Sequence, residues 1–415
     1  MKKLSSLLIF FYIILINFSY IYCEEPPNLN VTSYILIEKN SGTILSEKNS
    51  DMKIYPASTT KILTAIVSLE NTDLEKKITV TQSAINAIGP GGMNINLQVG
   101  EILNLENLLN AMLLSSANEA AYCIAEGSMT DFKTFMNKMN STSKNLGAVN
   151  SNFINPNGMF NENHFSTASD LAIISKYAMQ NDSFRNIVSK TSYKLPPTNK
   201  HAFWPVLPIS NNFVVDNTKS EFYSKVTGIK TGYLSESKRN LCSSAINSDG
   251  LELISVIIGA NTIAERDNYS KALLEYGFRN FSMQKIISKG EIIKDNLIVN
   301  NSKDNSYLTL VSNNDIESIL PNDKDSWNIE TIENIKTDIK APINAGQNFG
   351  TIEYKFGNIS LGKINVVADR SIEKKEIIQV KKLFSHNIMF IFNIFIIIIG
   401  ITFILRIIKK IIILR

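Results

Sequence analysis

The chain has 415 residues, of which 44% are hydrophobic and 19% are charged, and its formal net charge is +4. Six basic residues lie at the two ends, and without them the body of the chain is slightly acidic: Lys2, Lys3, Arg406, Lys409, Lys410 and Arg415. This balance excludes the basic surface that nucleic-acid binding requires, so we expect no nucleic-acid partner. The length between the two ends is sufficient for two domains.

Residues 1–23 have the pattern of a secretion signal. Two lysines precede an apolar run from Leu4 to Tyr22, and polar residues follow Cys23. A transmembrane anchor is the competing interpretation. Bulky residues directly before Cys23 argue against a lipid-modified cysteine, so we expect signal cleavage near this residue.

Residues 28–278 are expected to form an α/β domain. A hairpin opens it, with strands over 32–38 and 42–45 joined by a Lys-Asn-Ser-Gly turn. Apolar periodicity predicts helices at 59–70, 102–114, 119–127, 128–146, 167–179 and 262–277. Strands are expected at 224–231 and, as a pair joined by a Ser-Asp-Gly turn, within 240–260. A hairpin, a helical block, strands and a closing helix describe an α/β sandwich with a largely antiparallel sheet.

Residues 283–370 are expected to form a separate, small all-β domain. The composition changes there to short alternating runs, divided by asparagine, aspartate and glycine, at 305–311, 327–332, 351–354 and 364–367. No long helix is expected in this region. A charged linker over 371–387 follows it.

An 18-residue apolar run from Ile388 to Leu405 is expected to anchor the chain in a membrane. As a helix it would be about 27 Å long, close to the thickness of the hydrocarbon core. The basic residues of the tail, 406–415, place that tail inside and the body outside. A helix lying in the membrane interface is the alternative, but isoleucine surrounds the segment on every side and leaves no strong polar face.

The cysteines and histidines show no spacing typical of a metal site. Cys123 and Cys242 lie in apolar surroundings, and we expect two buried thiols, with a disulfide as the alternative. His164, His201 and His386 are far apart in the sequence. We therefore expect neither a metal ion nor a cofactor.

A serine and a lysine lie three residues apart in YPASTTKILTA, residues 55–65. The same spacing recurs elsewhere in the chain, but only Ser58 follows a proline turn and begins a long apolar helix. Positions i and i+3 share a helix face, which puts the Lys61 amine within reach of the Ser58 hydroxyl. The alternative is a serine N-cap followed by a solvated lysine. An alcohol needs a base near pH 7, and no histidine is placed to serve, so Lys61 is the candidate. Desolvation and a second cation would keep its amine neutral.

Two further polar motifs follow in the sequence. Ser116 and Asn118 come directly after the predicted buried helix that ends at Leu114, so their side chains are expected to project into a cleft. Lys230 and Thr231 end the strand predicted over 224–231, so an extended backbone places a lysine and a hydroxyl at a sheet edge. Gly232 allows a ligand to approach that backbone closely. Each motif is weak alone, and their order along one chain makes the combination specific.

PASTTK, SAN and KTG in this order resemble the active-site motifs of the serine penicillin-recognising family. VTGIKTGY at 226–233 and HFSTASDLA at 164–172 are similar to the low-molecular-mass D-alanyl-D-alanine carboxypeptidases. The segments at 341–343 and 346–347 resemble the C-terminal β domain of those enzymes. The resemblance covers the chain from about residue 30 to residue 370 and implies a penicillin-recognising serine transpeptidase-like fold.

The resemblance implies removal of the terminal D-alanine from a peptidoglycan stem pentapeptide. Ser58 would be acylated by the penultimate D-alanine, and water would then release the shortened peptide. Lys61 would activate Ser58, and Ser116 would pass a proton to the leaving amine. β-Lactam antibiotics would acylate the same serine. The catalytic domain would face the cell wall from the outer side of the cell membrane.

The resemblance also implies which residues hold the substrate. Asn118 would hold a substrate amide, while Lys230 and Thr231 would attract the substrate carboxylate beside Gly232. The backbone N–H of Ser58 and that of Tyr233 would form the oxyanion hole. His164 matches a family motif, and we interpret it as a structural residue.

The sequence departs from the family pattern after Tyr233. Relatives often carry threonine in place of Leu234 and an Ala-Gly pair in place of Ser237 and Lys238. These positions lie next to the motif that is expected to bind the substrate carboxylate.

A β-lactamase and a catalytically silent wall-binding module are the two alternatives to the carboxypeptidase. A β-lactamase needs a base that activates water, and Glu162, the sole glutamate between Glu126 and Glu221, lacks the ExxxN pattern. A catalytically silent wall-binding module is expected to lose Ser58, Lys61 or Lys230, and all three are present. The sequence therefore favours the carboxypeptidase.

Overall fold

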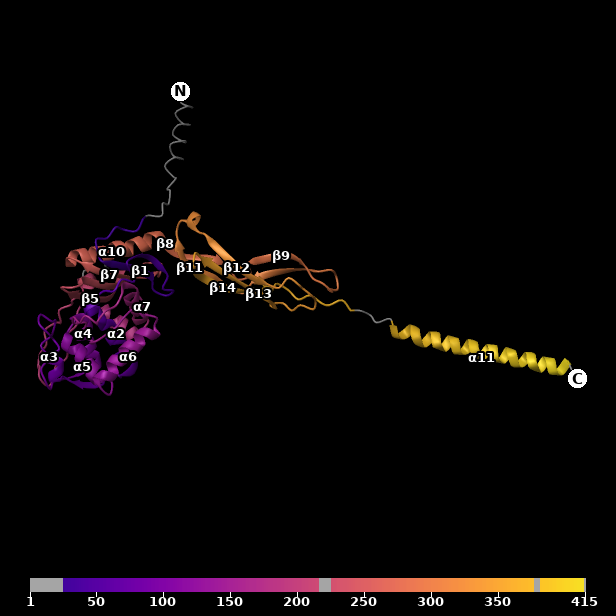
Figure 1. The fold of residues 1–415 in the computed structure, drawn as a ribbon, viewed down its shortest axis with the longest axis horizontal. Helices are drawn as coiled ribbons and strands as arrows, with labels where there is room; N and C mark the ends of the chain where they lie inside the picture. The colour runs from indigo at the N-terminus through magenta and orange to yellow at the C-terminus, as the bar shows by residue number, and fades with distance from the viewer. Residues whose placement is uncertain (1–24, 216–224, 377–380, 414–415) are drawn as a thin grey trace, which may run out of the picture. The chain divides into compact units, whose positions relative to one another are not determined.

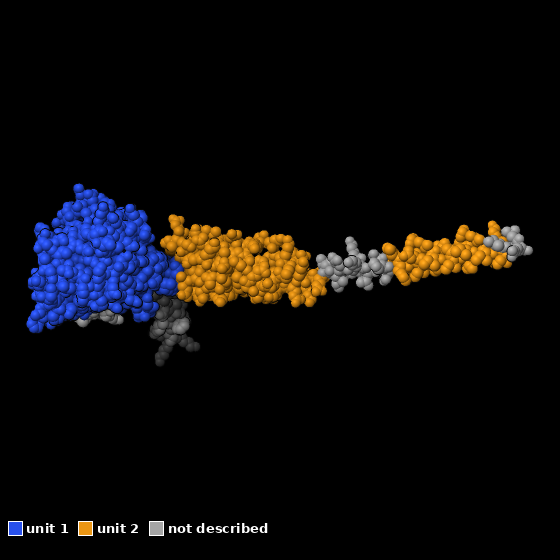
Figure 2. Space-filling view, turned by 90° about the horizontal axis from the view of Figure 1, so that it is seen from below, with its two compact units in different colours: residues 1–284, 318–327 blue, residues 285–317, 328–415 orange. Residues whose placement is uncertain are grey.

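The computed structural model describes residues 25–215, 225–376 and 381–413. The predicted signal at 1–23 lies outside the described residues. The chain forms two compact units, marked in Figure 2. The first comprises Met1–Gln284 with Ser318–Trp327, and the second comprises Lys285–Glu317 with Asn328–Arg415.

A five-stranded antiparallel sheet is the centre of the first unit, with the strand order β2-β1-β7-β6-β5. Its strands are β1 (Ser33–Glu38), β2 (Ile44–Lys48), β5 (Val226–Leu234), β6 (Lys238–Ile246) and β7 (Glu252–Ala260). The predicted hairpin and the predicted antiparallel sheet are confirmed. β7 is buried along its whole length, whereas β5 is an edge strand.

The sheet separates two apolar cores, because successive side chains of a strand point to opposite faces. On β6, Leu241 belongs to the core beneath α10 (Ile263–Asn280), and the adjacent Cys242 belongs to the core of the helical block. Figure 1 shows α10 on one side of these strands and the helical block on the other. The predicted α/β sandwich is therefore confirmed.

The helical block begins with α2 (Lys61–Asn71) and α3 (Gln82–Asn86). It continues with α4 (Leu105–Leu114), α5 (Asn118–Ser128), α6 (Phe132–Asn145), α7 (Ala168–Ala178), α8 (Asp182–Val188) and α9 (Asn212–Val215). Because the burial of an apolar face stabilises helices more than propensity does, the most buried of them, such as α4, were the clearest in the sequence.

Two predicted helix starts were wrong, and side-chain caps explain both. Residues 102–104 form β4 (Ile102–Asn104), which pairs with β3 (Lys77–Thr79), and α4 begins only after it. The Asn104 side chain accepts a hydrogen bond from the N–H of Asn107. The helix predicted over 128–146 starts at Phe132, because the Asp131 side chain accepts from the N–H of Thr134. Such caps satisfy donors that the first helical turn leaves free.

The second unit contains a five-stranded antiparallel sheet with the order β12-β13-β14-β10-β9. Its strands are β9 (Ile292–Ile298), β10 (Tyr307–Ser312), β12 (Ile329–Ile335), β13 (Asn348–Phe356) and β14 (Ile359–Ala368). β8 (Phe281–Ile287) and β11 (Ile316–Pro321) form a separate two-stranded sheet. Each predicted strand run overlaps one strand of the large sheet.

A single long helix, α11 (Lys381–Ile413), ends the described chain. Its segment Ile388–Lys410 is long and apolar enough to cross a membrane, by length and composition. The helix includes the predicted span at 388–405 and extends on both sides of it, into residues that were expected to be linker and tail.

Both described cysteines are free and buried, so the alternative of a disulfide between Cys123 and Cys242 is wrong. Burial raises the pKa of each thiol to about 12. Neither thiol is therefore reactive near neutral pH.

Candidate active site

Ser58 lies in a tight turn directly before α2. This turn is a 3-10 helix, η1 (Ala57–Thr60), so the helix predicted over 59–70 is α-helical only from Lys61. Neither η1 nor α2 has a side-chain cap, and the Ser58 Oγ lies 2.9 Å from the Lys61 Nζ instead. Residues i and i+3 eclipse each other in a 3-10 turn, which favours this pairing.

Lys61 is fully buried, with 0% of its surface exposed. Its Nζ lies 2.9 Å from the Ser58 Oγ, 2.8 Å from the Asn118 Oδ1 and 2.7 Å from the Asn157 carbonyl oxygen. A charged ammonium would donate to all three oxygens, whereas a neutral amine would donate to two of them and accept the Ser58 hydroxyl proton with its lone pair, so the distances alone fit both forms. Because Lys61 is fully buried, the alternative of a solvated lysine is wrong.

The surroundings of Lys61 favour that neutral form. Burial holds the pKa of Lys61 well below its usual value, and the positive charge of Lys230 lowers it further. The buried carboxyl of Glu119 acts in the opposite direction. Burial raises the pKa of Glu119 itself, although its Oε1 accepts a hydrogen bond from the N–H of Ile95 at 2.7 Å.

Ser116 and Asn118 lie between α4 and α5, where the chain turns sharply. Ser116 has a φ of 61°, and Asn118 begins α5. The N–H of Asn118 donates to the Met93 carbonyl at 2.8 Å, and its Nδ2 donates to the Ile88 carbonyl at 3.0 Å. These bonds fix the amide so that its Oδ1 faces Lys61.

The third motif lies on the edge strand β5. Lys230 is fully buried, and its Nζ donates to the Thr231 carbonyl at 3.1 Å. Burial and the charge of Arg266 lower the pKa of Lys230 to about 7. The Thr231 hydroxyl lies 3.3 Å from the hydroxyl of Ser210.

Strand β5 runs directly against the turn that carries Ser58. A Cβ atom at Gly232 would lie 3.0 Å from the Pro56 carbonyl oxygen and 3.3 Å from the Ser58 nitrogen. Asn240, on the neighbouring strand β6, donates to the carbonyls of Tyr55 and Pro56 at 3.2 and 3.4 Å. A side chain larger than hydrogen at Gly232 would therefore displace the turn.

A cavity of about 520 Å³ lies where these elements meet. It is lined by Ser58, Ser116, Asn118, Thr231, Gly232 and Tyr233. Lys61 and Lys230 lie beneath its walls, where they contact Ser58 and Thr231. The structure thus brings together every predicted site residue.

Several residues of the site were not found in the sequence. The Asn157 carbonyl and Ser210 contact the predicted residues from distant segments, and Arg239 and Arg266 line the cavity. Glu119, which directly follows Asn118, acts on the pKa of Lys61 through its charge. Arg266 is 4% exposed, and its Nε donates to the Asp267 carboxylate at 2.7 Å, while its Nη2 has no hydrogen-bond partner among the described residues. Apart from Glu119, these residues belong to no local motif, since only the fold brings their segments to the cleft.

His164 and Glu162 take no part in the cavity. The imidazole of His164 lies 2.9 Å from the Thr60 hydroxyl and accepts from the N–H of Ile154 at 3.2 Å. Burial lowers the pKa of His164 to about 4. These contacts agree with a structural histidine that anchors its loop to η1, directly before α2. Glu162 is exposed and does not line the cavity.

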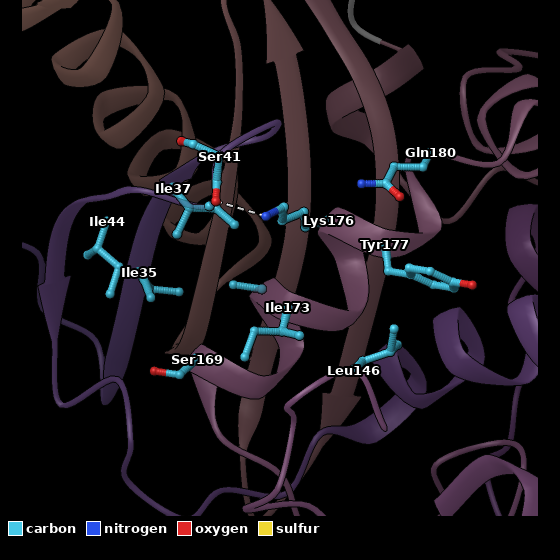
Figure 3. Close-up of a pocket in the computed structure, with 12 residues that line it drawn as sticks. Ile35, Ile37, Ser41, Ile44, Leu146, Ser169, Ile173, Lys176, Tyr177 and Gln180 are labelled. Carbon is cyan, nitrogen blue, oxygen red and sulfur yellow. Dashed lines mark hydrogen bonds between the residues drawn. The ribbon is translucent and has the colours of Figure 1, made fainter. Parts of the chain in front are cut away.

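A second cavity, of about 430 Å³, lies between the β1–β2 hairpin and α7 (Figure 3). Its lining is largely apolar, with Ile35, Ile37 and Ile173 among its side chains. Lys176 lies at this cavity and donates to the Ser41 carbonyl at 2.9 Å. It contains none of the predicted site residues, so the chemistry belongs to the larger cavity.

Two protein families match the chain. The family described as D-alanyl-D-alanine carboxypeptidase matches residues 22–262, and the C-terminal domain of penicillin-binding protein 5 matches residues 281–374. D-alanyl-D-alanine carboxypeptidase DacF of Bacillus subtilis is 29% identical over 345 residues, which cover 82% of this chain and 86% of that protein. DacA of Haemophilus influenzae is 28% identical, over 82% of this chain and 85% of that protein.

Solved structures show the same likeness. Penicillin-binding protein 5 from Haemophilus influenzae superposes with a TM-score of 0.65 at 28% identity, covering 85% of this chain and all of that one. The Streptomyces K15 DD-transpeptidase superposes with a TM-score of 0.58 at 27% identity, over 61% of this chain and 99% of that one. The resemblance seen in the three motifs is confirmed: this chain belongs to the D-alanyl-D-alanine carboxypeptidase family of serine penicillin-recognising enzymes.

Proposed function

We propose that this protein removes the terminal D-alanine from peptidoglycan stem pentapeptides through an acyl-enzyme on Ser58. The observation that carries the proposal is the fully buried Lys61 amine, 2.9 Å from the Ser58 hydroxyl. Burial makes this amine a base, and the hydroxyl beside it becomes a nucleophile.

The reaction begins when the neutral Lys61 amine takes the Ser58 proton. The Ser58 Oγ then attacks the carbonyl carbon of the penultimate D-alanine, and the backbone N–H groups of Ser58 and Tyr233 receive the oxyanion. Ser116 relays this proton from Lys61 to the leaving amine as the peptide C–N bond breaks, which frees D-alanine and returns Lys61 to its neutral form. Water then hydrolyses the ester, releases the shortened peptide and restores Ser58.

The substrate carboxylate is held on the β5 side of the cavity. Thr231 lines the cavity there, and the Lys230 ammonium lies directly behind it. We add Arg266 to this pair, because its buried Nη2 lacks a partner in the cavity wall. Since the pKa of Lys230 is about 7 in the free enzyme, an adjacent carboxylate would raise it and keep the lysine charged. Asn118 holds a substrate amide on the opposite side.

We also propose that the protein is anchored in the cell membrane with its catalytic domain facing the cell wall. The predicted signal, the apolar segment of α11 and the basic residues after it support this orientation. Residues 28–278 would form the catalytic domain and residues 283–370 the β domain, which agrees with the ranges that the two families match. Protease treatment of intact cells would degrade the catalytic domain if this orientation is right.

The test is incubation of the purified protein with a stem pentapeptide, followed by mass spectrometry. The expected product is lighter by one alanine. Ser58→Ala is expected to abolish both D-alanine release and labelling by penicillin, and persistence of either would show that the nucleophile is misassigned. Slow penicillin turnover is expected as well, because Glu162 is outside the cavity. Rapid turnover would favour a β-lactamase instead.

A further inference from the structure

The cavity contains an arginine that the proposed reaction leaves without a role. Arg239 is the second residue of β6 and pairs in register with Tyr233 of β5, so the two side chains lie on the same face of the sheet. The guanidinium carbon of Arg239 lies 4.7 Å from the centroid of the Tyr233 ring. Both residues line the cavity, and Tyr233 is 58% exposed.

No carboxylate of the described residues forms an ion pair with Arg239, and its Nε has no hydrogen-bond partner. Glu236, the nearest acidic residue in the sequence, accepts a hydrogen bond from Ser235 instead. The ring of Tyr233 therefore holds a guanidinium whose charge no carboxylate of the described residues neutralises. Such a group is prepared to bind a planar anion, and carboxylates fit guanidinium geometry best.

The neighbouring Lys238 does not duplicate this charge in the cavity. Its Nζ donates to the Asn261 side chain at 2.7 Å, and it does not line the cavity. Of these two neighbouring cations, Arg239 is therefore the one that lines the cavity.

The direction of the bound peptide decides which carboxylate Arg239 meets. In the proposed reaction the terminal carboxylate lies at Thr231, and the scissile carbonyl lies at the N–H of Tyr233. Successive residues of an extended strand are about 3.3 Å apart, so Tyr233 lies about 7 Å beyond Thr231. A peptide that follows β5 therefore places the residue preceding D-Ala-D-Ala next to Tyr233 and Leu234, and the Arg239 side chain is level with Tyr233.

We propose that Arg239 and Tyr233 form a second anion subsite, which recognises a side-chain carboxylate on the residue that precedes D-Ala-D-Ala. The inference rests on the proposed carboxypeptidase function and names its substrate class: stem peptides with an acidic, not an amidated, residue at that position. Arg239 acts as a specificity-determining residue and takes no part in bond breaking.

The test compares two stem pentapeptides that differ in one group. In the first, the residue before D-Ala-D-Ala carries a free carboxylate on its side chain, and in the second this carboxylate is a primary amide. The kcat/KM for D-alanine release is measured with the full-length protein and with Arg239→Gln, Arg239→Lys and Lys238→Gln. Labelling by fluorescent penicillin verifies that each variant is folded.

The wild-type protein is expected to prefer the carboxylate peptide by about tenfold, the value of one charged hydrogen bond in a partly open cleft. Arg239→Gln is expected to remove that preference, and Arg239→Lys to retain part of it, because lysine keeps the charge but loses the stacked plane. Lys238→Gln, the matched control, is expected to keep the full preference.

Two results would overturn the inference while leaving the carboxypeptidase intact. One is equal cleavage of both peptides by the wild-type protein. The other is an equal loss on both peptides in Arg239→Gln, which would assign Arg239 to the terminal carboxylate. If the wild-type protein releases no D-alanine from either peptide, the proposed function fails, and the subsite fails with it.

Discussion

Lysines of the cleft and lysines of the β unit are in opposite environments. Lys61 and Lys230 are fully buried, and no carboxylate of the described residues forms an ion pair with either. In the second unit, Lys294 and Lys303 lie 2.8 and 3.1 Å from the carboxylates of Glu333 and Glu373. The hydrogen bond and charge of Glu373 raise the pKa of Lys303, whereas burial lowers those of the cleft lysines. The comparison shows that the environment, and not the residue type, turns a lysine into a base.

The largest expected effect comes from Lys61→Arg. Arginine keeps the positive charge but cannot lose its proton near neutral pH, so Ser58 loses its base. We expect the rate of acylation by labelled penicillin to fall by about a thousandfold. Lys303→Arg is the matched control in the β unit and should leave that rate unchanged. Near-normal acylation of Lys61→Arg would remove the distinction between the two kinds of lysine.

Lys230→Gln tests how far one buried lysine depends on the other. The charge of Lys230 lowers the pKa of Lys61, so its removal should raise that pKa and move the rising limb of the pH–rate profile to higher pH. Loss of carboxylate binding should also lower kcat/KM for the stem peptide by about ten- to a hundredfold. An unshifted limb would show that the two amines are not electrostatically linked.

Burial of a titratable group also makes stability depend on pH, and His164 is the example. Its folded-state pKa of about 4 lies below the usual 6.5, so the unfolded chain binds a proton that the folded chain rejects between these values. Stability should therefore be complete above pH 6.5 and fall toward pH 4, by about 3 kcal/mol at the low end. Urea unfolding of the wild-type protein and of His164→Gln across this range would measure the difference. If the free energy of unfolding falls equally with pH in both proteins, groups other than His164 cause the loss of stability in acid.

The smallest expected effect is that of Glu119→Gln. The Glu119 carboxylate raises the pKa of Lys61, so its removal should move the rising limb to lower pH, opposite to Lys230→Gln and by less than about one pH unit. The glutamine oxygen can still accept from the N–H of Ile95, which should keep the 93–97 loop in place. A shift in the same direction as that of Lys230→Gln would contradict the electrostatic account.

Sequence patterns predicted the elements whose signal is local. Alternation and turn residues predicted the β1–β2 hairpin and the strand pair β6–β7, and the structure contains both. The three motifs were found because the residues within each motif are close in the sequence. The 3-10 geometry at Ser58 was not predicted, because residues i and i+3 are neighbours in a 3-10 turn and in an α-helical turn alike, so the spacing does not separate the two. The helix starts at 105 and 132 were missed because each depends on a single capping side chain.

Long-range contacts were the part of the site that the sequence concealed. The Asn157 carbonyl reaches Lys61 from 96 positions away, and Asn240 reaches Pro56 from 184 positions away. Arg239 and Arg266 resemble ordinary surface arginines in the sequence, and only the fold places them at the cavity. Residues of this kind are found once the sheet register and the helix packing are known.

The protonation state of the Lys61 amine is the most direct test of this account. NMR of the protein labelled with ¹⁵N-lysine would follow the Nζ signal across pH, with Lys61→Arg identifying the resonance. We predict a neutral amine near pH 7, with a pKa well below the usual 10.5. A Lys61 signal that stays protonated until it titrates near 10.5 would contradict the account.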